Sequence, residues 1–168
     1  MILLKTVLVT IFLLLSGDFI ATFLYHVPEH IFGKFHTIVH HSPNRSFVRY
    51  ALRTRKPCAL ITGFFGAFPY LMFTPFLWMV SPVGTILGLA LAECHVEWRH
   101  ISLETWKTPP RLERICRFFC ITTPERHWQH HCNSRVAFGD IFTFYDQPAQ
   151  EWFRFLLRIR KKLRASYG

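Results

Sequence analysis

The histidines are the residues of this chain whose pattern points to chemistry. All ten fall into four clusters, and no histidine lies outside them. Neutral imidazole is a common ligand for iron, zinc, copper and nickel. One metal ion cannot use ten ligands, whereas two ions with four or five each can, so we predict a dinuclear metal site built almost wholly of nitrogen. The predicted ligands are His26 and His30; His36, His40 and His41; His95 and His100; and His127, His130 and His131.

The spacing within the clusters favours helices as the elements that carry them. In the first, second and fourth clusters two histidines stand four residues apart, so they share one helix face. In the second cluster the additional His41 is turned roughly 100° from His40 by the helical period. The third cluster departs from this pattern, because His95 and His100 are five residues apart and roughly 140° out of register. A helix end, a bulge or a loop must therefore lie between them.

Acidic side chains close to the clusters are candidates for orienting the imidazoles, because a carboxylate can accept the N–H of the ring nitrogen that does not bind metal. One of them, Asp18, lies towards the histidine end of an apolar segment. A carboxylate at the centre of a bilayer costs about 2.5–3.5 kcal/mol, so we expect Asp18 at the interface, facing the histidines. An ordinary helix-end charge is the alternative. The candidates are Asp18, Glu29, Glu93, Glu97 and Asp140.

Two apolar segments are expected to anchor the chain in a membrane. Residues 1–24 are just long enough to cross a bilayer, with a secretory signal peptide as the alternative. Residues 57–92 contain no charged residue and several prolines and glycines. They are predicted to form a helical hairpin that turns between Thr74 and Gly84. A single crossing would place the third and fourth histidine clusters across the bilayer from the first two, which could then share no metal site.

The remaining segments are predicted to form a cap on one side of the membrane. Residues 25–56 hold the first two clusters and several arginines, which by the positive-inside rule makes this side cytoplasmic. Residues 93–150 hold the other two clusters, and Thr123 is expected to cap the last histidine helix, with proline following it. Residues 151–168 form a basic amphipathic tail, suited to an interfacial helix on anionic lipid or to a solvated basic face.

Composition supports one membrane domain, spanning residues 1–168. Hydrophobic residues make up 51% of the chain and aromatic residues 17%, yet the formal net charge is +10. Apolar segments joined by basic loops explain this combination, whereas nucleic-acid binding does not, because no groove-reading motif is present. No phosphate-binding glycine motif indicates a nicotinamide or flavin site. The predicted fold is all-α: an integral membrane helical protein with a cytoplasmic, histidine-rich helical cap around a dinuclear metal site.

The histidine pattern HX3H, HX3HH, HX4H, HX2HH resembles that of the membrane-bound fatty acid hydroxylase/sterol desaturase superfamily. The resemblance extends from about Asp18 to Asp146. It rests on the sequence segments GDFIATFLYHVPEH, FHTIVHHSPN and TPERHWQHH, the last followed by FGDIFTFYD. It implies a di-iron centre that activates O2 and attacks a C–H bond of a membrane lipid, a fatty acyl, sterol or related chain, with zinc as a possible substitute in purified protein. Bacterial β-carotene hydroxylases carry a similar set in a similarly short chain, so a carotenoid ring hydroxylase is the alternative.

The same resemblance implies an external electron donor, because the chain contains no reductase module. A ferredoxin or a cytochrome b5-type protein would suit the basic cytoplasmic face. Two interpretations of other classes stay open. A catalytically silent metal-binding membrane protein would have the same ligands, so only turnover distinguishes it. A membrane zinc hydrolase would need an open metal position and a carboxylate general base, for which ten histidines leave little room.

Overall fold

The computed structural model of the protein describes residues 1–33 and 47–167. These residues form helices joined by turns and loops, with one isolated antiparallel bridge between Ile121 and Phe142 and no strand. The predicted all-α fold is therefore confirmed. The described residues do not include three of the predicted ligands, His36, His40 and His41. The helices are α1 (Ile2–Ile20), η1 (Ala21–His26), α2 (Val27–Phe32), α4 (Phe47–Thr54), α5 (Cys58–Leu71), α6 (Thr74–Val80), α7 (Pro82–Arg99), α8 (Pro110–Phe118), α9 (Pro124–Cys132), η2 (Thr143–Tyr145) and α10 (Asp146–Tyr167).

The first helix is longer than the apolar segment that predicts it. α1, η1 and α2 run on from one another as a single helix of 31 residues, or about 46 Å at the usual rise. A bilayer core is about 30 Å thick, so the final turns, with His26 and His30, extend beyond it. η1 is a π-helical stretch, whose hydrogen bonds close one residue later than those of an α-helix. A π-helix turns through a smaller angle per residue than an α-helix does. Residues four apart therefore stay on one side of the helix, as Asp18, Thr22 and His26 do.

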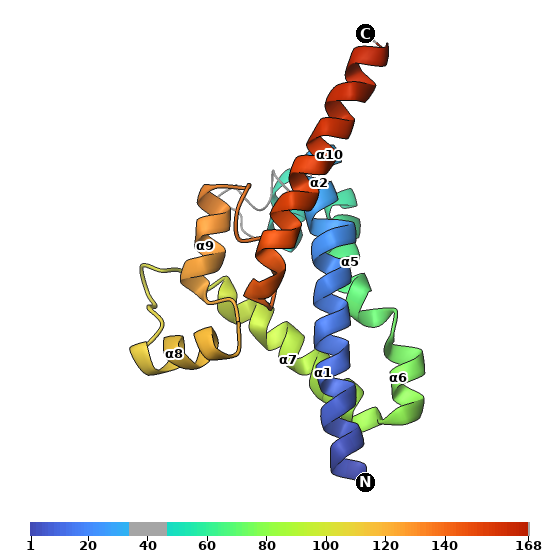
Figure 1. Ribbon diagram of the computed structural model, residues 1–168, viewed down its shortest axis with the longest axis vertical. Coiled ribbons are helices and arrows are strands. Elements are labelled where there is room, and N and C mark those ends of the chain that lie inside the picture. Colours follow the sequence, from blue (N-terminus) through green and yellow to red (C-terminus); the bar gives the residue numbers. More distant parts are fainter. Residues whose placement is uncertain (34–46, 168) are drawn as a thin grey trace.

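The apolar stretch of residues 57–92 reverses direction at Ser81, within the interval expected. α5 and α6 run one way, and Ser81 has an extended backbone and caps α7, its Oγ accepting the Gly84 N–H at 3.1 Å. The same Oγ lies 3.2 Å from Thr6 Oγ1 on α1. α7 then returns alongside α1, towards the end of the molecule where α2 and α9 lie (Figure 1). Both sets of described histidines therefore meet at one end of the helices.

Small residues let α7 approach α1 closely. Gly84, Gly88 and Ala92 follow one another at four-residue spacing, and all three are buried. A Cβ at Gly84 would lie 2.6 Å from the Thr6 carbonyl oxygen, so no larger residue fits there without moving the helices apart. Thr10 Oγ1 donates to the Gly84 carbonyl at 2.9 Å. Small residues at this spacing are typical of helix pairs inside membranes.

Two segments of the described chain are long and apolar enough to cross a membrane. They are Ile2–Phe32, with a mean hydropathy of 2.2, and Cys58–Val80, with 1.5. Large apolar side chains on α5 and α6 are exposed, such as Phe64, Phe76 and Met79 at 55%, 72% and 86%. So many exposed apolar groups along one pair of helices fit a lipid environment better than water.

The last helix has two halves with different surroundings. Its first half packs on α2 in a core that joins Val27 and Ile31 to Phe153, and Trp152 Nε1 donates to the Phe23 carbonyl at 2.9 Å. The second half, which is basic and exposed, projects beyond the rest of the chain, and the C-terminus lies at the opposite end of the long axis from the N-terminus (Figure 1). This direction leads away from the apolar end of α1, which disfavours an interfacial tail and favours a solvated basic face.

The close approach of α1 and α7 gives the first testable prediction. Gly84→Leu should separate the two helices, because the new side chain would meet the Thr6 backbone. We expect the substitution to lower the free energy of unfolding by roughly 1–3 kcal/mol, which is the usual cost of overpacking a core contact. Ala90→Leu adds the same side chain on the exposed side of α7 and serves as the control. The measurement is the thermal unfolding temperature in detergent. An unfolding temperature that neither Gly84→Leu nor Ala90→Leu changes would contradict this packing.

Candidate metal centre

Six of the predicted ligands gather in two groups of three. His26, His30 and His130 form one group, and within it the ligand nitrogens all lie within 4.8 Å of one another. We call this group triad A. In a second group, triad B, the ligand nitrogens also lie within 4.8 Å of one another. No carboxylate or thiolate joins either group among the described residues. Triad B consists of His100, His127 and His131.

Helix α9 supplies ligands to both triads because of its HX2HH spacing. His127 and His131 are four residues apart and differ by about 40° around the helix, whereas the neighbours His130 and His131 differ by about 100°. His130 therefore points to α2, and His131 points with His127 to the end of α7. The rings of His127 and His130 are stacked with centroids 6.1 Å apart. The two triads consequently lie side by side.

The short contacts between histidines join ring nitrogens of one kind, Nε2. In triad A, His130 Nε2 lies 3.0 Å from that of His26 and 2.9 Å from that of His30. In triad B, His127 Nε2 lies 3.0 Å from that of His100 and 3.1 Å from that of His131. Two nitrogens bound to one ion at about 2.1 Å lie about 3.0–3.4 Å apart for ligand angles between a right angle and the tetrahedral angle. The spacing in both triads suits shared metal ions.

The other ring nitrogen shows which tautomer these rings adopt. The Nδ1–H of His26 donates to the Phe138 carbonyl at 3.1 Å, and that of His130 donates to the Val136 carbonyl at 2.8 Å. A carbonyl can only accept, so in the neutral ring each Nε2 carries a lone pair. Two lone pairs 3.0 Å apart repel each other unless a cation lies between them. The donor set of triad A therefore fits a metal ion.

The third cluster is divided by the end of a helix, as its five-residue spacing predicts. His100 is the C-cap of α7, and its Nδ1–H donates to the Val96 carbonyl at 2.7 Å, which turns Nε2 towards triad B. His95 belongs to neither triad. Its Nε2–H donates to the Thr122 carbonyl at 2.9 Å, and its buried Nδ1 has no hydrogen-bond partner among the described residues. Of this predicted pair, His100 lies in triad B, whereas the role of His95 as a ligand stays a prediction.

Burial keeps three imidazoles of this region neutral. Burial, followed by the positive charge of Arg99, lowers the pKa of His100 to about 3 and that of His95 to about 4. The same two causes lower the pKa of His127 well below its usual value. Only the neutral ring binds metal, so these histidines need not release a proton before binding at neutral pH.

One loop, residues 138–142, connects triad A to the membrane helix, and we call it the anchor loop. The Asp18 carboxylate accepts the backbone N–H groups of residues 140, 141 and 142 at 3.1, 3.1 and 2.7 Å, and the Thr22 hydroxyl at 3.0 Å. Asp146, at the start of α10, accepts the Gly139 N–H at 2.7 Å. Two buried carboxylates thus hold four consecutive backbone donors.

The anchor loop presents an acceptor pair to His26. The Phe138 carbonyl accepts its Nδ1–H, and the Asp140 carboxylate lies 3.4 Å from the same nitrogen. Arg99 forms an ion pair with Asp140 at 2.7 Å and also donates to the Asp140 carbonyl at 2.7 Å. Although burial alone raises the pKa of Asp140, the charge of Arg99 and the contact with His26 lower it well below its usual range. Asp140 stays ionised and fixes the orientation of His26.

An apolar wall closes one side of triad A. The ring of Phe138, which is fully buried, lies with its centroid 5.8 Å from that of His26, 5.9 Å from that of His30 and 5.3 Å from that of His130. Phe138 packs in turn on Phe153 of α10 at 5.4 Å. Water is excluded from this side, which strengthens electrostatic interactions in the site.

The other predicted carboxylates differ in their positions. Asp18 contacts no described histidine, and it acts one step further away than expected, through the anchor loop. Glu93 and Glu97 are exposed on α7 and form no hydrogen bond or ion pair with the described residues, so neither orients a described histidine. The Glu29 carboxylate lies against Gly33, where a Cβ would be 2.0 Å from it. Among the candidates it is Asp140 whose carboxylate lies beside a described histidine, 3.4 Å from His26 Nδ1.

Sequence patterns could have indicated some residues that the prediction missed. Arg99 lies inside the word HVEWRH, and a lone arginine between two metal histidines in an apolar setting needs a buried acidic partner. The GxxxGxxxA spacing from Gly84 was also visible. Phe138 and Asp146 carry no such signal, because only the folded loop brings them to the histidines. The predicted cap is confirmed, since Thr123 Oγ1 accepts the Arg126 N–H at 3.4 Å.

Comparison with known proteins gives one match. A protein-family model described as Fatty acid hydroxylase matches residues 10–150, which include every described histidine. No curated protein and no solved structure matches the chain.

The position of Asp18 generates a prediction about metal affinity. Asp18→Asn should release part of the anchor loop, because an amide cannot accept all four of its hydrogen bonds. We expect metal affinity to fall about 10–100-fold, the usual effect of losing a group that orients a ligand, in a protein that still inserts into membranes. Glu97→Gln changes an exposed carboxylate of α7 and is the control. Metal retention against a chelator that is equal in Asp18→Asn and wild type would contradict this role.

The lowered pKa of His95 predicts how stability depends on pH. The unfolded chain binds a proton at His95 below pH 6.5, whereas the folded metal-free protein does so only near pH 4. The unfolding free energy should therefore fall as the pH drops from 6.5 towards 4, by about 1.4 kcal/mol per pH unit from this residue. In His95→Gln, whose amide can still donate to Thr122, the slope should be shallower by that amount. Denaturant titrations of both metal-free proteins across this range measure it, and identical slopes would refute it.

Proposed function

Because the chain belongs to the fatty acid hydroxylase family, we propose that it is a membrane-bound oxidoreductase that holds two iron ions and uses O2 to hydroxylate or desaturate a lipid chain. The observation that carries this proposal is the pair of neighbouring all-histidine triads that share α9. Fatty acyl and sterol chains are the first candidate substrates, with a carotenoid ring as the alternative.

Different residues would bind each of the two proposed metal ions. In this proposal triad A binds one ion and triad B the other, and the bound irons supply the redox chemistry that activates O2. Three of the rings, those of His26, His100 and His130, keep their Nε2 lone pairs inward because their Nδ1–H groups donate to carbonyls. Further ligands proposed from the sequence are His36, His40 and His41, which lie outside the described residues, and His95 through its buried Nδ1.

The donor set supports oxidation over hydrolysis. A zinc hydrolase needs a carboxylate base that faces an open metal position. Among the described residues no carboxylate joins either triad, and Asp140 is already engaged by Arg99 and His26. Two all-histidine triads with no described acidic ligand would therefore hold metal ions that supply redox chemistry, and no protein carboxylate is placed there to act as a hydrolytic base.

The arrangement of the helices supports a lipid substrate and an aqueous donor. Exposed apolar side chains cover α5 and α6, so an acyl chain can approach from the bilayer. The two triads lie beyond these helices, at the end that we propose faces the cytoplasm. There an external donor, a ferredoxin or a cytochrome b5-type protein, would deliver the two electrons of each turnover. The net charge of +10 favours an acidic donor.

Alanine substitutions on α9 test the proposed function. His127→Ala and His130→Ala each remove a ligand of a different triad, and each should abolish lipid oxidation while the protein still inserts into the membrane. Gln129→Ala, between them on the exposed side of the same helix, should keep full activity. Mass spectrometry of lipids from cells that express each variant checks this, through the gain of one oxygen atom or the loss of two hydrogens.

The same experiment separates an enzyme from a catalytically silent metal protein. A silent protein would bind metal and leave the lipid profile unchanged in every variant, including the wild type. Lipid oxidation that survives in both His127→Ala and His130→Ala would remove the two-ion assignment and the proposed reaction.

A further inference from the structure

Helix α8 exposes an apolar face that no other helix of the described chain covers. Ile115, Phe118 and Phe119 are 53%, 80% and 60% exposed. The inward side of the helix is held by Cys116, which is 3% exposed and whose carbonyl accepts the Ile121 N–H at 2.7 Å. α8 is therefore anchored on one side and open on the other.

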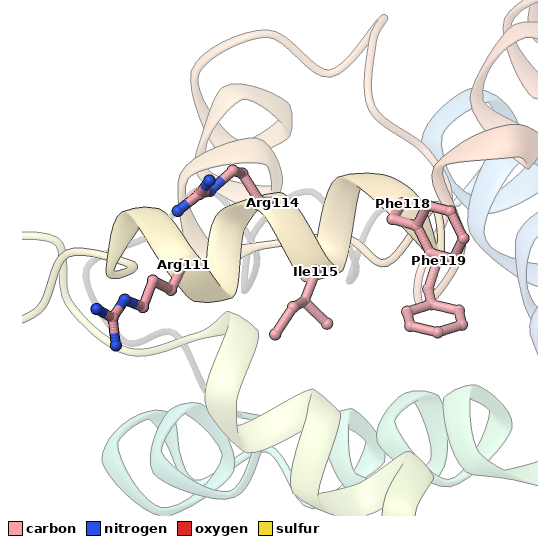
Figure 2. Close-up of a pocket in the computed structure, with 5 residues that line it drawn as sticks. All are labelled: Arg111, Arg114, Ile115, Phe118 and Phe119. Atoms are coloured by element: carbon pink, nitrogen blue, oxygen red, sulfur yellow. The ribbon is translucent and has the colours of Figure 1, made fainter.

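Two arginines share the open face with these apolar side chains and line a shallow hollow with them. Arg111 and Arg114 lie at the N-terminal end of α8, Phe118 and Phe119 lie at the C-terminal end, and Ile115 lies between them (Figure 2). Such a face has one end that favours phosphate groups and one end that favours hydrocarbon. Arg117, by contrast, is paired with Glu113 at 2.9 Å.

The place of α8 in the molecule indicates what this face meets. Along the long axis α8 lies closer than α9 to the end that holds the N-terminus, and it runs across the direction of α1 (Figure 1). The apolar α1, α6 and the turn at Ser81 lie at that end. Along the long axis, α8 therefore lies on the side of the histidine-bearing α9 that faces the apolar N-terminal end of the molecule (Figure 1).

We propose that α8 lies in the membrane interface, with Phe118 and Phe119 among the acyl chains and with Arg111 and Arg114 on the phosphates of anionic lipids. Charge complementarity favours this occupant over a second copy of the chain. Copies that each carry a net charge of +10 repel one another, whereas an anionic bilayer attracts arginines near its surface. Bound in this way, α8 fixes the depth of α9 and its histidines relative to the lipid. This goes beyond the proposed reaction and does not require that the metal be iron.

Photo-crosslinking of the full-length protein tests the proposal. Phe118→p-benzoylphenylalanine places a reactive ring where the aromatic side chain already lies. Leu163→p-benzoylphenylalanine is the control, because Leu163 is 50% exposed on the half of α10 that projects away from α1. In liposomes of equal zwitterionic and anionic phospholipid we expect several-fold more phospholipid adduct at position 118 than at position 163. Equal yields at the two positions, or mainly chain-to-chain adducts at position 118, would overturn the proposal.

The arginines are tested in the same liposomes. Adding Arg114→Gln to the position-118 variant should lower the ratio of anionic to zwitterionic lipid in its adducts by about fivefold, the effect expected of one arginine near an anionic surface. Arg117→Gln removes an arginine of α8 that is already paired and serves as the control. An anionic share that is unchanged by Arg114→Gln would overturn the assignment of the phosphate contacts. The metal content of each variant, measured on the same samples, reports separately on the histidine site and should stay unchanged.

Discussion

A carboxylate on the first membrane helix holds the site together. Asp18 is completely buried and accepts three backbone N–H groups of the anchor loop. Burying a carboxyl group is costly unless its oxygens are hydrogen-bonded, so Asp18 and the loop require each other. The loop carries Phe138 and Asp140 to His26, and Asp140 in turn requires Arg99 of α7. One chain of polar contacts therefore ties α1, α7 and the anchor loop to triad A.

The second constraint is the geometry of a single short helix. Adjacent histidines on α9 point about 100° apart, so His130 and His131 belong to different triads. The partners of α9 then need to arrive from two directions. The long first helix brings His26 and His30 from one side, and the end of α7 brings His100 from the other. The close packing of α1 on α7, which Gly84 permits, sets the separation of these two directions.

Much of this arrangement could be predicted from the sequence because it depends on the helical spacing of residues that are close together in the chain. The four-residue spacings place His26 over His30 and His127 over His131, and the five-residue spacing of His95 and His100 indicates a helix end. The spacing of residues along a helix does not indicate which contacts the loops make. Asp18 lies 122 residues before its first loop partner, and sequence distance alone could not show that it faces backbone N–H groups instead of imidazoles. For the same reason Glu93 and Glu97 were predicted from proximity along the chain, whereas α7 turns them to its exposed side.

The central claim, that two neighbouring histidine triads hold two irons, is tested most directly by the metal content of the intact protein. The measurement is anaerobic metal analysis of full-length protein, purified in detergent after expression in iron-rich medium. Two irons per chain are expected, because each triad offers three converging imidazole nitrogens. A single metal ion per chain, or stoichiometric zinc that cannot be exchanged in protein without activity, would contradict the account.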